Sequence, residues 1–133
     1  MSPTFPVVVS AVLQRGDAIL LLKRAEHLDH APGLWDPCSG RVERGETPKQ
    51  AVIREAKEET GLNVEPLRVI DTFRFLRGAA QEECIGITFL CRADEGEIIL
   101  SEEHTEAQWV KLDNLDQYEL AAGLFAVLQS LKT

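Results

Sequence analysis

Three glutamates near the middle of the chain are spaced so that a helix would bring them onto one face. Glu55, Glu58 and Glu59 lie three and four residues apart, which is the spacing of neighbours on an α-helix. Like charges at this spacing repel by about 0.2–0.5 kcal/mol per pair, so helix stability alone does not favour them. A cation bound among them would turn the repulsion into attraction. The spacing therefore predicts a metal site built on a helix.

The chemistry of the ligands indicates the kind of metal. Carboxylate and backbone carbonyl oxygens suit Mg²⁺, Mn²⁺ or Ca²⁺ rather than Zn²⁺ or copper. Mg²⁺ commonly takes one or two carboxylates, keeps several waters and completes its shell with substrate phosphates. Ions held in this way activate water and stabilise the leaving oxygen in a displacement at phosphorus. Mg²⁺ is therefore the expected cofactor, with Mn²⁺ as an alternative.

The helix that must carry these carboxylates has clear start and stop signals. Thr47 and Gln50 form a capping box, and Pro48 suits the first helical position. Gly61 suits the left-handed residue that closes a helix. We expect a helix of about 13 residues between them. The preceding stretch, Ser39–Gly45, is expected to be a loop because it holds two glycines and little hydrophobicity.

The segment from Gly40 to Leu62 resembles the Nudix box, G-x5-E-x7-R-E-U-x-E-E-x-G-U, in which U is an aliphatic residue. The seven fixed positions all match, with Ala56 and Leu62 at the aliphatic places: Gly40, Glu46, Arg54, Glu55, Glu58, Glu59 and Gly61. At an average usage of about 5–7% per residue type, seven fixed residues match by chance about once in 10⁸ to 10⁹ starts. The chain is thus identified as a member of the Nudix (MutT-like) family.

The resemblance implies a fold and an activity. The implied fold is of the α/β class, an α/β/α sandwich with a mixed β-sheet between helices. The implied activity is a divalent-metal-dependent hydrolysis of a nucleoside diphosphate linked to another group X. Water would attack one phosphorus of the diphosphate, and the products would be a nucleotide and a phosphorylated X.

The resemblance also implies site residues. Glu55, Glu58 and Glu59 would act as metal ligands or bases, with the base assigned only to the set. The carbonyl of Gly40 would add a ligand. Arg54 would orient a carboxylate through an ion pair with Glu46, while Glu46 and Gly61 would be structural. In some members a loop after the box adds a further glutamate to the site, a few residues before a tryptophan. Glu103, ahead of Trp109, is the candidate here.

Substrate contacts are harder to assign from the sequence. Arg24, at the end of an expected strand, and Arg74 are candidates to meet phosphates. Trp35, Phe73 and Phe75 are candidates to stack on a base or sugar ring. The identity of group X stays open.

Two alternatives remain open. Some Nudix domains bind nucleotides as sensors without hydrolysing them, although every box carboxylate is present here. Isopentenyl diphosphate isomerases share the fold and use a loop cysteine near this point. Many members carry a Pro-Gly-Gly run that ends at the glycine of the box, whereas this chain has Pro37-Cys38-Ser39-Gly40, so Cys38 could serve such an enzyme.

Length and charge exclude several classes of function. The 133 residues suit a single domain spanning 1–133. The formal net charge of −8, without a basic stripe, argues against binding nucleic-acid polymers or an anionic membrane. Three cysteines without metal-ligand spacing, and no basic residue before the first apolar run, favour a cytoplasmic protein. A homodimer stays open.

The remaining elements follow from hydrophobic patterning. Strands are expected over Val7–Leu13, Ala18–Lys23, Leu67–Leu76, Cys84–Arg92 and Gln108–Leu112. A turn is expected over Arg77–Gln81, and apolar spacing predicts a last helix over Leu120–Leu131. This order suits a mixed sheet covered on both sides.

Overall fold

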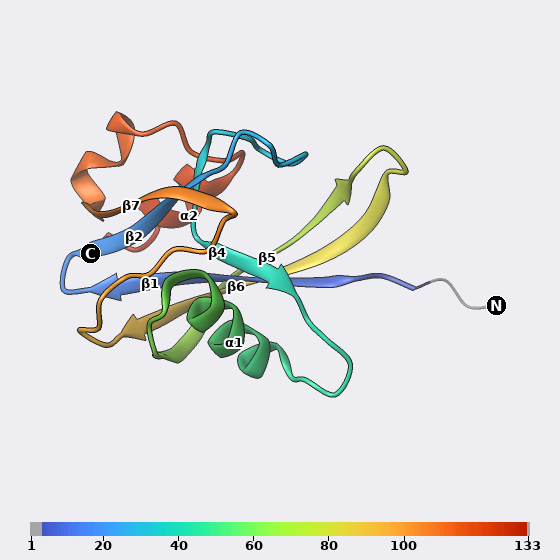
Figure 1. Ribbon diagram of the computed structural model, residues 1–133, viewed down its shortest axis with the longest axis horizontal. Coiled ribbons are helices and arrows are strands. Elements are labelled where there is room, and N and C mark those ends of the chain that lie inside the picture. Colours follow the sequence, from blue (N-terminus) through green and yellow to red (C-terminus); the bar gives the residue numbers. More distant parts are fainter. Residues whose placement is uncertain (1–3, 133) are drawn as a thin grey trace.

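The computed structural model describes residues 4–132; residues 1–3, part of the stretch expected to lack a secretory signal, lie outside it. Figure 1 shows the arrangement of the elements. The elements in chain order are β1 (Val7–Arg15), β2 (Ala18–Arg24), β3 (Trp35–Asp36), β4 (Cys38–Arg41), α1 (Pro48–Thr60), β5 (Val64–Arg77), β6 (Glu82–Ala93), β7 (His104–Lys111), the 3₁₀ helix η1 (Leu112–Gln117) and α2 (Leu124–Gln129).

The sheet is mixed, as expected. Its main path runs β3-β2-β1-β6-β5, with β4 paired to β1 and β7 paired to β2. β1 and β6 run parallel over Val7–Gln14, whereas the other pairs are antiparallel. β1 meets β2 only at Gln14 and Arg15, because β4 takes the same edge of β1 from Val8 to Ala11. The sheet therefore opens on this side, between β4 and the β2–β3 pair.

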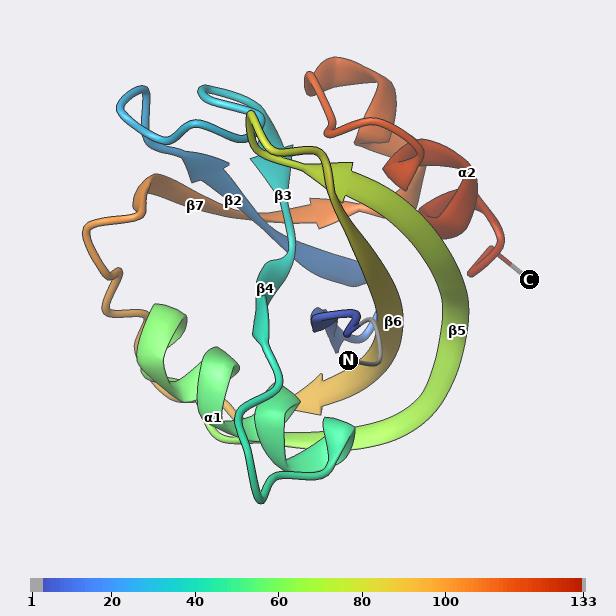
Figure 2. The ribbon, with the colours of Figure 1, turned by 90° about the vertical axis from the view of Figure 1, so that its right-hand side faces the viewer.

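Two apolar clusters cover the two faces of the sheet. Alternate residues of β2 divide between them, since Leu20 and Leu22 pack under α1 while Ile19 and Leu21 pack under η1 and α2. Figure 2 shows the two α-helices on opposite sides of the strands. The α/β/α sandwich with a mixed sheet is confirmed.

Most of the expected elements are present. The strand predictions over β1, β2, β5 and β6 are confirmed, and the turn between β5 and β6 lies at Gly78–Gln81. β7 is longer than predicted, and its Trp109 and Val110 point to opposite clusters as expected.

The expectation of a loop over Ser39–Gly45 is wrong in its first half. Residues up to Arg41 form β4, in which Ser39 pairs with Ser10 and Gly40 pairs with Val9 of β1. The free edge of β1 supplies backbone partners to a segment whose own strand propensity is low. Tertiary pairing thus overrides local composition here.

The predicted helix over Leu120–Leu131 is also too long. Only Leu124–Gln129 is α-helical, and Leu120 instead bridges to Trp35 of β3. Gly123 has φ 81°, a left-handed conformation that ends the preceding segment and starts the helix afresh. Within residues 4–132, no helix is long and apolar enough to cross a membrane.

Candidate active site

The helix α1 holds the carboxylates, and its ends are capped as predicted. The Thr47 hydroxyl accepts from the Gln50 N–H at 3.2 Å, and the Gln50 side chain accepts from the Thr47 N–H at 2.9 Å. Gly61 has φ 77° and donates its N–H to the Lys57 carbonyl at 2.9 Å. Buried Ala51, Val52 and Ala56 fix the helix on the sheet, and Glu59 is buried with them.

Arg54 links the acidic groups of the motif. Its Nε and Nη2 donate to the two oxygens of Glu46 at 2.7 and 2.9 Å, which is the ion pair that the resemblance implies. Its Nη1 lies 2.7 Å from Glu55 Oε1 and 3.3 Å from Glu58 Oε2. Nη2 also donates to the Arg41 carbonyl at 3.0 Å. The planar guanidinium therefore joins the loop, β4 and α1 in one set of charge-assisted hydrogen bonds.

The interaction with Arg54 shapes the charge of Glu46. Hydrogen bonds from the Arg54 side chain and from the Glu43 N–H lower the pKa of Glu46 to about 2. In the same pairing the pKa of Arg54 is raised. Both groups are thus ionised throughout the range in which the protein works, as a structural ion pair requires.

The absence of a side chain at Gly40 makes room for Glu55. A Cβ added to Gly40 would lie 2.1 Å from Glu55 Cδ and 2.2 Å from Glu55 Oε1. Any other residue would therefore displace the carboxyl group. The motif glycine serves to bring a backbone segment and a carboxylate side by side, which is what a shared set of oxygen donors needs.

Glu59 is the most buried of the motif glutamates. It is 3% exposed, and its Oε2 accepts from the Ser39 N–H at 3.1 Å. Burial, together with the nearby charges of Glu55 and Glu103, raises the pKa of Glu59 to about 9. The pKa of Glu55 is raised mainly by burial, against the lowering effect of Arg54. The repulsion expected from the sequence is thus present, and Glu103 from β6–β7 takes part in it.

In this arrangement the carboxylates do not yet share a common centre. Among residues 4–132, no three His, Cys, Asp or Glu side chains converge closely enough to hold one ion. Arg54 holds oxygens of both Glu55 and Glu58 instead. The donor set is all oxygen, and it is crowded by like charge beside Gly40, so it fits a hard divalent cation.

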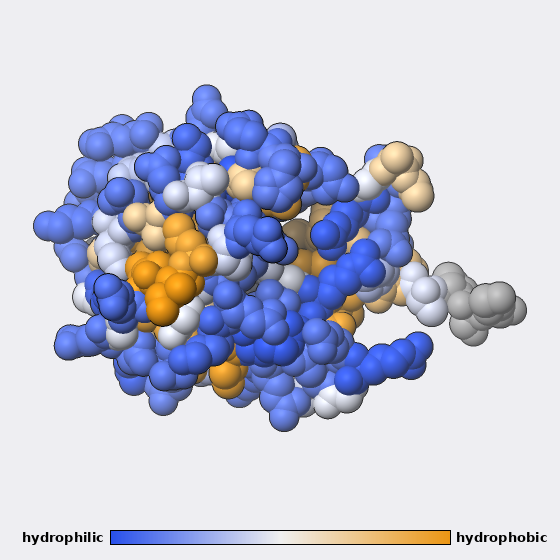
Figure 3. Space-filling view, viewed as in Figure 1, coloured by the Kyte–Doolittle hydropathy of each residue, from blue (hydrophilic) through white to orange (hydrophobic). Residues whose placement is uncertain are grey.

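A cleft of about 810 Å³ runs past these groups. Three of the predicted site residues line its acidic end, namely Gly40, Glu55 and Glu103. Both predicted phosphate contacts, Arg24 and Arg74, line the cleft as well. Glu58 and Glu59 do not line it. Figure 3 shows the molecule hollowed between the β5–β6 hairpin and the rest of the surface.

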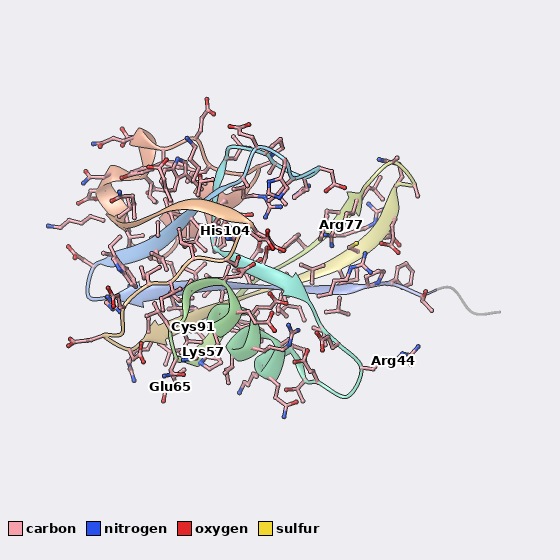
Figure 4. The ribbon with its side chains drawn as sticks, viewed as in Figure 1. Arg44, Lys57, Glu65, Arg77, Cys91 and His104 are labelled. Atoms are coloured by element: carbon pink, nitrogen blue, oxygen red, sulfur yellow. The ribbon has the colours of Figure 1, made fainter. Side chains whose placement is uncertain are left out.

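The two predicted phosphate contacts are held differently. Arg24 Nε donates to the His30 carbonyl at 2.8 Å, and its Nη1 lies 4.0 Å from Asp36 Oδ2. Arg74 is more exposed and forms an ion pair with Glu83 on the neighbouring strand. Arg77 lines the cleft from the same hairpin (Figure 4), and no ion pair is found for it among residues 4–132.

The sequence reasoning missed Asp36. This residue sits on the two-residue strand β3, lines the cleft, and has its pKa raised to about 7 by burial, against the effect of Arg24. A carboxyl just before the motif, in a stretch without patterning, was the only signal available. Its position beside Arg24 comes from pairing of β3 with β2.

Cys38, a candidate in the sequence, and His104 are both buried. Cys38 is 1% exposed within the cluster under α1, and burial and the charge of Glu59 raise the pKa of its thiol. His104 lies at the start of β7 (Figure 4) and is 5% exposed, and burial and Arg24 lower its pKa to about 4. Within residues 4–132 neither of its ring nitrogens has a hydrogen-bond partner. Both side chains therefore lie in packed surroundings.

Known proteins share this arrangement. The NUDIX domain family model matches residues 4–131. The NAD-capped RNA hydrolase NudC of Salmonella agona is 36% identical over 111 residues, which are 83% of this chain and 40% of the relative. The chain thus spans about two fifths of the length of the curated relatives it matches.

Solved structures agree with this match. The MutT Nudix hydrolase of Burkholderia pseudomallei superimposes with a TM-score of 0.83 at 27% identity, covering 98% of this chain and 100% of that one. An ADP-ribose pyrophosphatase of Streptococcus suis gives 0.72 at 26% identity, covering 98% and 94%. The match of nearly the whole chain, with the capped helix and the arginine-linked glutamates in place, means that this protein belongs to the Nudix hydrolase family.

Proposed function

We propose that the protein is a divalent-metal-dependent hydrolase that cleaves the diphosphate of a nucleoside diphosphate linked to another group X. The observation that carries the proposal is Glu59, a glutamate 3% exposed and crowded by the charges of Glu55 and Glu103. Burial disfavours the ionised form of such a carboxyl, and a cation bound beside it would make ionisation favourable again. The cleft beside it is large enough for a nucleotide-sized ligand.

The residues that would hold the cation are those that the resemblance implies, from the motif and from the later loop. They are the carbonyl of Gly40 and the carboxylates of Glu55, Glu58, Glu59 and Glu103. Mg²⁺ is the expected ion and Mn²⁺ the alternative. When bound, it would supply charge neutralisation at the diphosphate and a water of lowered pKa.

The chain's own groups would set the geometry of the reaction. Arg54 would hold Glu55 and Glu58 in place until the ligand and cation arrive, since its Nη1 reaches both carboxylates. The base that takes a proton from water belongs to the set Glu55, Glu58, Glu59 and Glu103. Arg24 and Arg74 also line the cleft, and they would meet the negative charge of the ligand.

The names of relatives support a diphosphate bond as the target. The Streptococcus suis neighbour is named as an ADP-ribose pyrophosphatase, and the Salmonella relative as acting on NAD-capped RNA. NAD and ADP-ribose share a diphosphate between two sugar-bearing groups. This chain carries a net charge of −8, so we propose a small nucleotide rather than a polymer as its partner.

The two alternatives differ in their support. A sensor without catalysis would not need the complete set of motif carboxylates. An isomerase would need Cys38 in contact with its substrate, whereas this thiol is 1% exposed inside the core cluster. Hydrolysis is therefore the stronger proposal.

The test is a panel of nucleotide substrates, with and without Mg²⁺, in which the released products are identified. The wild type should release a mononucleotide only with the metal, and Glu59→Gln should lose at least about 100-fold in turnover while remaining folded. Glu65→Gln is the control, because Glu65 is an exposed carboxylate paired with Arg92 on β6 (Figure 4). Metal-independent turnover, or full activity of Glu59→Gln, would contradict the proposal.

A further inference from the structure

The β5–β6 hairpin forms one wall of the cleft, yet it is poorly covered. β5 is 14 residues long and contains no buried residue, although it pairs with β6 along its length. Its cleft-lining residues are Asp71, Phe73, Arg74, Phe75 and Arg77. Figure 1 shows the hairpin projecting from the body of the molecule. Aromatic side chains on such a wall are available to a ligand rather than used in the core.

Phe73 is held in the cleft by a glycine on the neighbouring strand. Phe73 pairs with Gly86 in the antiparallel register of β5 and β6. A Cβ added to Gly86 would lie 2.2 Å from Phe73 Cζ and 2.5 Å from both Cε atoms. The tip of the ring therefore covers the Gly86 backbone, and only a glycine permits this position. The ring remains 37% exposed.

Two more rings extend this surface. The Phe75 ring lies 5.5 Å from the Phe73 ring, centroid to centroid, at 33°. The His30 ring lies 6.2 Å from that of Phe75 at 36°. Trp35 differs, because its ring packs edge-on against Tyr118 at 5.1 Å and 84° and belongs to the core cluster under α2. Among the three stacking candidates named from the sequence, Phe73 is therefore the one whose ring lies against a glycine of the neighbouring strand.

The two ends of the cleft carry opposite charges. Glu55 and Glu103 line its acidic end, whereas Arg74 and Arg77 flank the aromatic rings on the hairpin. An aromatic ring beside guanidinium groups suits a planar, electron-rich group attached to phosphates. A nucleobase has this chemistry, and an isoprenoid or a sugar does not.

We propose that Phe73, positioned by Gly86, is the stacking platform for the base of a nucleotide ligand. This inference rests on the proposed function for its metal and phosphate end, and it assigns the base of that ligand to a place in the cleft. Gly86 acts through the ring and is a positioning residue. Base stacking on an aromatic side chain changes affinity by about fivefold to 150-fold when the ring is removed.

The test compares ligands that bear a base with a ligand that lacks one. Adenosine, guanosine, cytidine and uridine 5′-monophosphates are titrated into the wild type without metal, with ribose 5-phosphate as the baseless ligand, and the ligand protons are followed by NMR. Protons of the base should move upfield on binding, because they enter the ring current of Phe73. Phe73→Leu should remove this shift and weaken nucleotide binding at least about fivefold, with ribose 5-phosphate unaffected.

Gly86→Ala separates the position of the ring from its presence. We expect it to reduce the shift and the affinity while Phe73 is intact, and to have no further effect in the Phe73→Leu background. Phe125→Leu is the matched control, since Phe125 is 46% exposed on α2 and does not line the cleft. Circular dichroism of each variant verifies that the fold is retained.

The possible outcomes are distinct. Three results would each contradict the role of Phe73 as a stacking platform. They are unchanged chemical shifts of the base protons in Phe73→Leu, an equal loss of ribose 5-phosphate binding in that variant, and no shift of the base protons with the wild type. A wild type that stacks bases but hydrolyses no nucleotide on the metal panel would contradict the proposed function while supporting the platform.

Discussion

The two ends of the cleft are held in opposite ways. At the acidic end, Arg54 donates to Glu46, Glu55, Glu58 and the Arg41 carbonyl, and Glu59 is almost fully buried. At the hairpin end, no residue of β5 is buried. The acidic end is held together by hydrogen bonds and ion pairs before any ligand binds, whereas the hairpin end offers aromatic rings and guanidinium groups to a ligand.

This difference separates two tasks. Groups that carry out a reaction must be held closely, because small displacements weaken catalysis. Groups that select a ligand can remain open, since their contacts form only in the complex. The same motif can thus serve many ligands when the hairpin changes.

The largest expected effect comes from loosening the acidic end. Arg54→Lys keeps the charge but loses the planar fork, so it cannot reach Glu46, Glu55 and Glu58 together. We expect turnover to fall about 100-fold or more on every substrate, and the free energy of unfolding to fall by about 1–2 kcal/mol. Steady-state kinetics and urea unfolding measure the two effects.

Arg44→Lys is the control for this substitution, because Arg44 lies on the loop between β4 and α1 and points away from the motif carboxylates (Figure 4). Wild-type turnover in Arg54→Lys would mean that charge alone, without the fork, is sufficient at this end.

An intermediate effect concerns pH and the metal. The pKa of Glu59 is raised from 4.5 to about 9, so between pH 7 and 9 the folded state keeps a proton that the unfolded chain has lost. The stability of the metal-free protein should therefore fall as pH rises through this window. His104 does not contribute there, since its pKa is lowered to about 4 and it is neutral in both states.

Thermal unfolding from pH 7 to 9, with and without Mg²⁺, measures this dependence. Glu59→Gln should flatten the pH profile of the metal-free protein, and Mg²⁺ should raise the melting temperature of the wild type most at the high-pH end. An identical pH profile in the wild type and in Glu59→Gln would show that ionisation of this carboxyl does not cause the loss of stability at high pH.

The smallest effect is expected at the hairpin. Arg77→Gln removes a partly buried cation from the hairpin wall of the cleft, so it should raise KM about twofold to fivefold with kcat nearly unchanged. The difference should shrink at high salt. Arg92→Gln is the control, because Arg92 pairs with Glu65 away from the cleft. A fall in kcat at constant KM would place Arg77 with the reacting groups instead.

Features that depend on local contacts were predicted correctly, whereas two features that depend on distant strand pairing were not. The helix Pro48–Thr60, its caps and the Arg54–Glu46 pair were all predicted, because their contacts are local or fixed by the motif. The loop over Ser39–Gly45 and the helix over Leu120–Leu131 were partly wrong, since Gly40 pairs with Val9 and Leu120 bridges to Trp35. Each error lies where a distant strand supplied a partner.

The sequence by itself determined the family, the capped helix and the repulsion among its glutamates, because residues three and four apart on a helix meet whatever the rest of the chain does. Tertiary structure alone decided that Glu103 joins this repulsion, that Asp36 lies beside Arg24, and that Phe73 covers Gly86. Strand pairing joins residues far apart in the chain, and its outcome depends on which neighbours and edges are available rather than on local preference.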